Sequence, residues 1–130
     1  MTKFESDFFQ KINFTPFQVN KYLTAAHHDL QIAKQSNLPE VIFDFSYKAF
    51  IRYGIALIAE KGYKVRSNLG HHFKIIEKMS EILSNEEIMT YGNRMRQMRN
   101  FNFYDEGTII SEKDAKEYLS FVGGIITRSK

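Results

Sequence analysis

The chain has 130 residues, of which 43% are hydrophobic, and this fits a single domain over residues 1–130 with one core. The absence of cysteine excludes thiol catalysis, thiolate metal sites and disulfides, and it favours a reducing compartment such as the cytoplasm. Lysine plus arginine number 18 against 15 acidic residues, too small an excess for a general nucleic-acid binder. No apolar run approaches the roughly 20 residues that span a bilayer, so we expect a soluble protein with no membrane contact.

The N-terminal segment, residues 1–14, has an apolar pattern typical of a short helix. Phe4, Phe8 and Ile12 recur at a spacing of four residues, so on a helix they would share one face. We therefore predict a short N-terminal helical arm that lies on the rest of the protein.

Two long helices are predicted next, and each begins with a proline at its first position. The first covers residues 16–36, where the Thr15 hydroxyl and the Gln18 side chain form the pattern of a capping box. The second covers residues 39–61 and ends at Gly62. Its apolar residues fall almost all round the helix, so we expect it to be the most buried element.

Three shorter helices complete the predicted fold. The third begins near Gly70, and the fourth begins after a cap at Ser84 and runs to about residue 104. The last covers residues 111–128 after a cap at Ser111. Strand patterns are too short to found a sheet. The predicted fold is all-α, an antiparallel up-and-down four-helix bundle with an additional C-terminal helix and the N-terminal arm.

The densest basic stretch lies in the fourth predicted helix and contains Arg94, Arg96 and Arg99. At about 100° per residue, Arg96 and Arg99 share one side of the helix. Asn100 and Tyr104, four residues apart, continue the polar face. Guanidinium groups match phosphate oxygens in a bidentate geometry, so this face predicts binding to a nucleic-acid backbone.

Other interpretations of this stretch remain open. The arginines can instead form surface ion pairs with nearby carboxylates. These carboxylates are Glu86, Glu87, Asp105 and Glu106. Gly92, one turn before Arg96, indicates that a partner helix packs closely there, and a second subunit is one source of that helix. The loop after the second helix adds Lys64 and Arg66 as further candidate nucleic-acid contacts.

The arginine helix resembles the signature helix of the HEPN superfamily, which comprises small prokaryotic helical bundles. The resemblance rests on Arg96, Arg99, Asn100 and Tyr104 at the end of a bundle helix. Upstream segments also resemble the family in the same order. They are residues 46–50, 56–63 and 69–72. The similarity therefore spans roughly residues 17–105.

This resemblance implies a homodimer in which two arginine helices form a composite basic cleft for RNA. Active members of the family are metal-independent endoribonucleases, often toxins of toxin–antitoxin or other defence systems, whose site pairs an arginine with a following histidine. By resemblance, Arg99 would stabilise charge on the phosphate, Arg96 would add to it, and Asn100 would orient Tyr104 or the cleft. Tyr104 stands where the histidine is expected, and a phenol with a pKa near 10 is a poor base. Activity would therefore be weakened or lost.

A second class of function is a protein-interaction module that pairs with a nucleotidyltransferase-type or antitoxin partner, with the arginines in an interface. The sequence predicts no cofactor and no metal site. His27 with His28, and His71 with His72, are adjacent pairs whose members point about 100° apart on a helix, so neither pair chelates one ion well. Either His71 or His72 would restore the enzyme hypothesis if it supplied the missing base.

Overall fold

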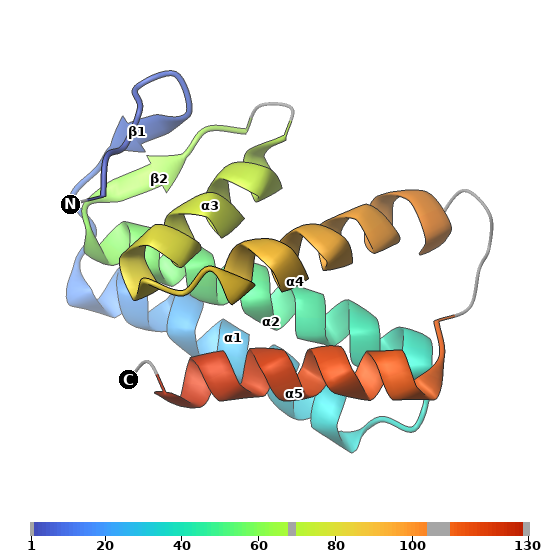
Figure 1. Ribbon diagram of the computed structural model, residues 1–130. Helices are drawn as coiled ribbons and strands as arrows, with labels where there is room; N and C mark the ends of the chain where they lie inside the picture. Colours follow the sequence, from blue (N-terminus) through green and yellow to red (C-terminus); the bar gives the residue numbers. More distant parts are fainter. Residues whose placement is uncertain (1, 68–69, 104–109, 129–130) are drawn as a thin grey trace.

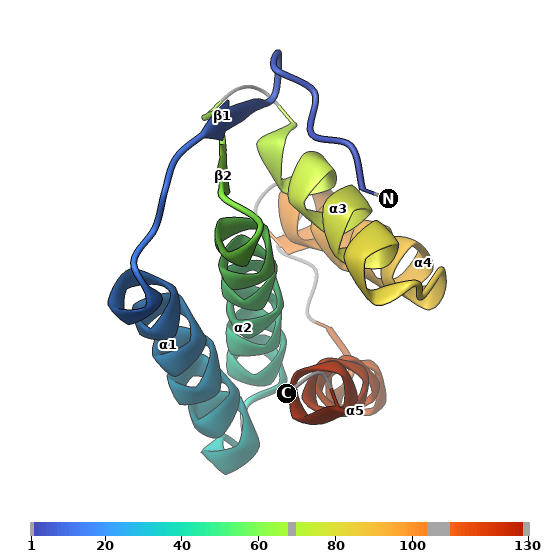
Figure 2. The ribbon, with the colours of Figure 1, turned by 90° about the vertical axis from the view of Figure 1, so that its left-hand side faces the viewer.

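The computed structural model describes residues 2–67, 70–103 and 110–128. Within them, helix α2 lies at the centre, with α1, α3 and α5 packed against it and α4 packed against α3 (Figures 1 and 2). The elements in chain order are β1 Phe9–Lys11, α1 Pro16–Gln35, α2 Pro39–Glu60, β2 Tyr63–Val65, α3 His71–Leu83, α4 Glu87–Gln97, a π-helix Met98–Phe103 and α5 Glu112–Arg128. The predicted all-α helical bundle is confirmed, with a small two-stranded sheet beside it. No helix in the described ranges is long and apolar enough to cross a membrane.

Local capping signals account for where the helices begin and end. Thr15 Oγ1 accepts the Gln18 N–H at 3.2 Å and Gln18 Oε1 accepts the Thr15 N–H at 2.8 Å, so the predicted capping box is present. After α2, Gly62 has a φ of +87°, a conformation that costs glycine little. Ser111 Oγ accepts the Asp114 N–H at 3.1 Å, which confirms the predicted cap of α5.

The predicted cap of the fourth helix is wrong, whereas its predicted end near residue 104 agrees with a helical segment that continues to Phe103. Ser84, with a φ of +50°, ends α3 instead of capping α4. Asn85 Oδ1 accepts the Glu87 N–H at 3.0 Å, the two-residue reach of an Asx turn. Helix α4 then stops at Gln97, where a π-helix replaces the predicted α-helix.

The predicted N-terminal helical arm is also wrong for the described part of residues 1–14. Strand β1 pairs with β2 in an antiparallel ladder, with Phe9 opposite Val65. Phe9 is only 2% exposed, and Phe4 stacks on Tyr63 with ring centres 4.2 Å apart. Burial of these rings and the ladder hydrogen bonds outweigh the local four-residue pattern. The loop expected after α2 therefore begins as a strand.

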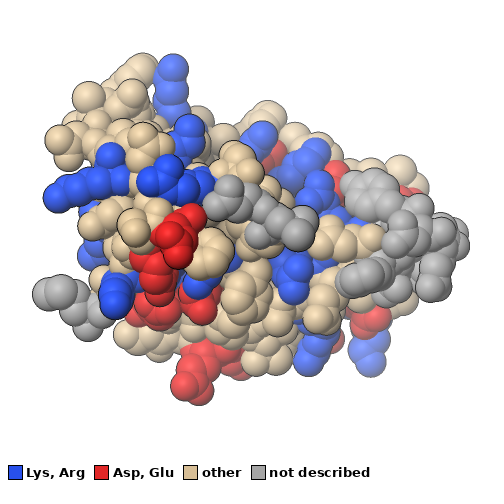
Figure 3. Space-filling view, turned by 90° about the horizontal axis from the view of Figure 1, so that it is seen from above, with Lys and Arg blue, Asp and Glu red and all other residues tan. Residues whose placement is uncertain are grey.

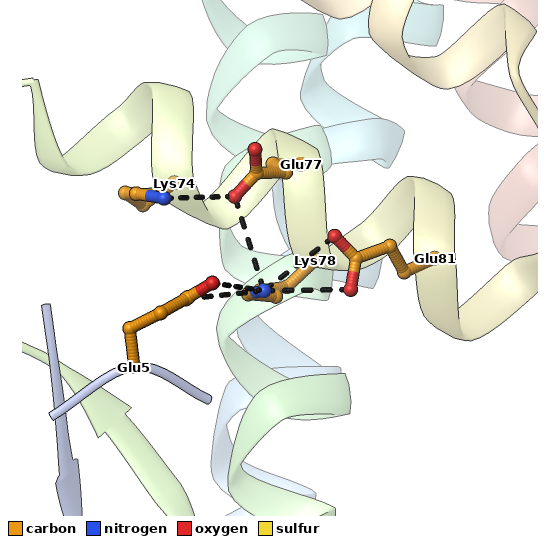
Figure 4. Close-up of polar contacts among 5 residues, drawn as sticks. All are labelled: Glu5, Lys74, Glu77, Lys78 and Glu81. Atoms are coloured by element: carbon orange, nitrogen blue, oxygen red, sulfur yellow. Dashed lines mark hydrogen bonds and ion pairs between the residues drawn. The ribbon is translucent and has the colours of Figure 1, made fainter. Parts of the chain in front are cut away.

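A buried lysine ties the N-terminal segment to α3 (Figure 4). The Lys78 side chain is 1% exposed, and its Nζ lies 3.2 Å from Glu5 Oε1 and 3.4 Å from Glu81 Oε1. Glu77 lies 3.8 Å from Lys78 and pairs more closely with Lys74, at 3.0 Å. A backbone hydrogen bond, aided by Lys78, holds the pKa of Glu5 below its ordinary value. These contacts compensate the desolvation of the lysine and fix the first residues on the bundle.

Gly92 of α4 packs against helices of its own chain. A Cβ placed on Gly92 would lie 2.8 Å from Ile76 Cγ2 and 2.8 Å from Phe50 Cε2, closer than side chains approach. The partner helices expected from the sequence are therefore α2 and α3. Gly92 gives no independent support to a dimer.

We expect Gly92→Ala to lower the free energy of unfolding by about 1–3 kcal/mol, because the added methyl must displace Phe50 and Ile76. Urea unfolding measures the loss. Gly123→Ala on α5 is the matched control, since a Cβ there meets no described atom within 4 Å and helix propensity favours alanine by about 1 kcal/mol. Equal unfolding midpoints for the two variants would contradict the close packing.

Candidate functional site

Among the predicted site residues, Arg99 has a buried nitrogen with no hydrogen-bond partner in the described part of the chain. It lies in the π-helix, and its guanidinium carbon is 5.4 Å from the centre of the Tyr47 ring on α2. Its Nε is buried and has no hydrogen-bond partner among the described residues. A buried donor left without an acceptor costs about 1–3 kcal/mol. A bound molecule with an acceptor atom would remove that cost.

His72 reaches the same tyrosine from the start of α3. Its Nδ1 lies 3.0 Å from the Tyr47 hydroxyl oxygen. His71 packs edge-on against the His72 ring, with ring centres 4.5 Å apart. The structure thus brings Tyr47, His72 and Arg99 together from α2, α3 and the π-helix.

These three side chains line a cavity of about 160 Å³. Its lining residues are Tyr47, Lys48, Ile51, Arg52, Ile55, His72 and Arg99. Lys48 Nζ lies 3.4 Å from Asp44, and Arg52 Nη1 lies 2.8 Å from Asp29, so both of these cations are paired. Arg99 forms no ion pair with a carboxylate of the described residues.

The environment of the cavity keeps His72 and Tyr47 neutral at pH 7. Desolvation, with the nearby His71, Arg99 and Arg96, lowers the pKa of His72 to about 4. Burial raises the pKa of Tyr47 to about 12. Two tautomers of His72 fit this hydrogen bond. In the first, Nδ1 has no proton and accepts from the Tyr47 hydroxyl. In the second, Nδ1–H donates to the hydroxyl oxygen, and Nε2 then has a lone pair that can accept a proton.

The start of α3 adds partial positive charge beside His72. Gly70 precedes the first turn with a φ of +79°, and no side chain of the described residues caps the helix. Free N–H groups at a helix start attract anions, and His72 is the second residue of this helix. Together with the Arg99 guanidinium, this arrangement suits an oxyanion such as a phosphate.

Arg96 lies on the same side of the molecule as Arg99. Its Nε and Nη2 both donate to Asn93 Oδ1, at 3.1 and 3.0 Å, and its guanidinium carbon is 5.6 Å from the Phe73 ring on α3. Its charge contributes to the lowered pKa of His72. Arg96 therefore adds to the positive field at the cavity without lining it.

Two other residues predicted on the arginine helix, Arg94 and Asn100, do not line the cavity. Arg94 lies over the Tyr91 ring at 5.4 Å and hydrogen-bonds with Tyr118 on α5, away from α3. Asn100 is exposed on the π-helix. Tyr104, the residue expected in place of the catalytic histidine, lies outside the described residues.

The two basic residues predicted in the loop after α2 lie in or next to strand β2. Lys64 is exposed, and Arg66 Nε donates to the Ser6 carbonyl oxygen at 3.0 Å. Basic side chains are spread across the middle of the face that Figure 3 shows, whereas acidic ones gather toward its lower left. Neither Lys64 nor Arg66 lines the Arg99 cavity.

The alternative prediction of surface ion pairs is not met by the described carboxylates. The three arginines of the helix form no ion pair with Glu86 or Glu87. The other two predicted partners, Asp105 and Glu106, lie outside the described residues. Among the residues of known placement, the arginines contact aromatic rings and polar side chains instead.

Sequence reasoning missed Tyr47 as a site residue and left the role of His72 open. The two residues are 25 positions apart, so no local spacing predicts their contact. One usable signal was present: a buried tyrosine on an apolar helix needs a partner for its hydroxyl. Among the described residues, no group of three or more His, Cys, Asp or Glu side chains could hold a metal ion.

Comparisons with known proteins give no match. A scan against protein-family models, a search of curated proteins and a search of solved structures each find nothing similar to this chain. The class that the fold defines is an all-α helical bundle with a basic cavity between three helices.

Proposed function

We propose that this protein is a HEPN-like RNA-binding protein with weak, metal-independent endoribonuclease activity. It binds a backbone phosphate in the cavity beside Arg99 and acts as a homodimer in the cytoplasm. The observation that carries the proposal is the buried Arg99 Nε, which has no acceptor among the described residues and lies beside a cavity that the neutral His72 also lines. A phosphate oxygen can accept a charge-assisted hydrogen bond from this Nε–H.

The chemistry of such a site follows from the needs of RNA cleavage. The 2′-hydroxyl loses its proton as its oxygen attacks phosphorus, a cyclic 2′,3′-phosphate forms, and the 5′-oxygen leaves with a new proton. Arg99 stabilises the charge on the phosphate oxygens. His72 accepts the 2′-hydroxyl proton when Nδ1–H is donated to Tyr47. The leaving oxygen takes its proton from water.

The same site explains why the activity would be weak. A general base works best when its pKa lies near the pH of the reaction. With a pKa of about 4, His72 is free to accept a proton at pH 7 but has little affinity for it. The low proton affinity of His72 does not weaken phosphate binding by Arg99, because the guanidinium stays charged across the physiological pH range.

We expect the protein to cleave a mixed RNA pool slowly in the presence of EDTA, and Arg99→Ala to reduce the rate by about 10²-fold. The products should end in 2′,3′-cyclic phosphate and 5′-hydroxyl groups. Arg94→Ala is the matched control, because Arg94 contacts Tyr91 and Tyr118 instead of the cavity. Its rate should stay near that of the wild type, and melting curves should show that both variants fold.

Two other results have clear meanings. Absence of cleavage together with RNA binding that Arg99→Ala loses would make the protein a binding member without activity. Absence of both would overturn the proposal and favour the alternative, a protein-interaction module with a nucleotidyltransferase-type or antitoxin partner. Salt separates these cases further, because phosphate binding weakens steeply as salt rises.

A further inference from the structure

A second cavity, of about 180 Å³, lies between α1, α2, β2 and α3. Its walls are mainly apolar and aromatic. They include Phe14, Tyr22, Tyr63, Ile58 and Ile75. Polar atoms come from Lys64, Ser67 and His71, which also line it. The cavity therefore combines flat hydrophobic surfaces with a few hydrogen-bonding groups, the usual make-up of a small-molecule site.

The apolar cavity adjoins the basic one. Ile55 of α2 lines both cavities. His71 lines the apolar cavity and His72 the basic one, and their rings are 4.5 Å apart. The two cavities thus share a wall made by one isoleucine and two adjacent histidines.

We infer that the apolar cavity holds the base of the RNA nucleotide whose phosphate binds beside Arg99; this inference rests on the function proposed above. A phosphate and its base are joined through one ribose, so a bound nucleotide needs a polar and an apolar chamber side by side. The aromatic walls of the second cavity offer stacking or edge contacts to a base. Ser67 and Lys64 offer hydrogen bonds to its edge.

The size of the cavity limits the ligand to one base. Its volume is well below the roughly 300–1,000 Å³ of pockets for drug-sized ligands. A single planar ring system fits such a space better than two stacked bases or a peptide segment. Because the basic cavity adjoins this one, a base that carries a phosphate should bind more tightly than an uncharged ring.

Binding of two single-stranded heptamers tests the inference. One is oligouridylate, and the other is an abasic ribose-phosphate chain with the same number of phosphates. Fluorescence anisotropy at low salt gives the affinities, and the recovered chains are checked for intact length. The wild type should bind the uridine heptamer at least about fivefold more tightly, since a stacked base contributes about 1–3 kcal/mol.

Ser67→Trp should remove this preference. Ser67 is an exposed loop residue that lines the cavity, so an indole there can fill the space without changing the core. Binding of the abasic heptamer should not change. Thr24→Trp, at an exposed position of α1, is the control and should keep the preference. Phe14→Ala removes an aromatic wall and should reduce the preference independently.

The outcomes separate the two proposals. Equal wild-type affinities for both heptamers, with both lost in Arg99→Ala, would overturn the base pocket and leave RNA binding at Arg99 intact. A Ser67→Trp variant that weakens both heptamers equally would also overturn the pocket. Affinities that do not depend on Arg99, or no binding at all, would overturn the proposed function and the pocket with it.

Discussion

Arg52→Ala is expected to lower the free energy of unfolding by about 3 kcal/mol. Arg52 Nη1 lies 2.8 Å from the Asp29 carboxylate, whose side chain is only 3% exposed. Without the arginine, the Asp29 carboxylate remains buried between α1 and α2 with its charge uncompensated, so its desolvation is no longer offset. Removing one partner of a buried ion pair costs about 3–5 kcal/mol of stability. We take the lower end of this range because 46% of the Arg52 side chain is exposed.

Lys48→Ala is the matched control for this prediction. Lys48 lies one turn earlier on α2 and pairs with Asp44 at 3.4 Å, but the Asp44 side chain is 30% exposed. Water solvates an exposed carboxylate when its cationic partner is removed, so we expect Lys48→Ala to lower the free energy of unfolding by less than about 1 kcal/mol. Urea unfolding of both variants gives the comparison. Similar losses would show that the burial of Asp29 is not the source of the effect.

The second large effect is a loss of stability as the pH falls from about 6.5 to about 4. An unfolded histidine has a pKa of about 6.5, whereas the pKa of His72 in the folded protein is about 4. Within this window the unfolded chain binds a proton that the folded chain does not, so the free energy of unfolding falls with pH. The full difference in pKa corresponds to about 3 kcal/mol. Because His72 is only partly buried, solvent screening reduces the expected loss to about 1–2 kcal/mol, and none of it is lost above about pH 6.5.

His72→Gln should flatten this pH dependence, because the variant has no group at position 72 that titrates in the window. His28→Gln, on the exposed face of α1, is the control and should leave the loss in place. Urea unfolding at several pH values measures both. Arg96 and Arg99 keep their charge throughout and Tyr47 stays protonated, so none of these three groups contributes to the change. An NMR titration that protonates His72 near pH 6.5 would contradict the assignment.

The helices could be predicted because their signals are local. The capping box at Thr15 and Gln18, the prolines at helix starts and the glycine after α2 act within a few residues of where they occur. The two strands could not be predicted this way. Their pairing joins Phe9 to Val65, and each strand has three residues, too few for a periodic pattern.

The candidate site was predictable only in part. Arg99 is one of several arginines in a basic stretch, but the burial of its Nε and its contact with Tyr47 depend on tertiary packing. Tyr47 and His72 meet it through tertiary packing. A helical wheel drawn at a constant angle per residue also fails beyond Gln97, because a π-helix places more residues in each turn.

The pairing of β1 with β2 also bears on how the chain folds. Helices α1 and α2 are joined by a short connection, so their packing closes a small loop at little entropic cost. The strand ladder must instead bring residue 9 to residue 65, with both long helices in the intervening loop. Contacts of such long sequence separation slow folding. We therefore expect the N-terminal segment to pair with β2 after α1 and α2 have packed together. The contact between Lys78 and Glu5 would form at that late stage.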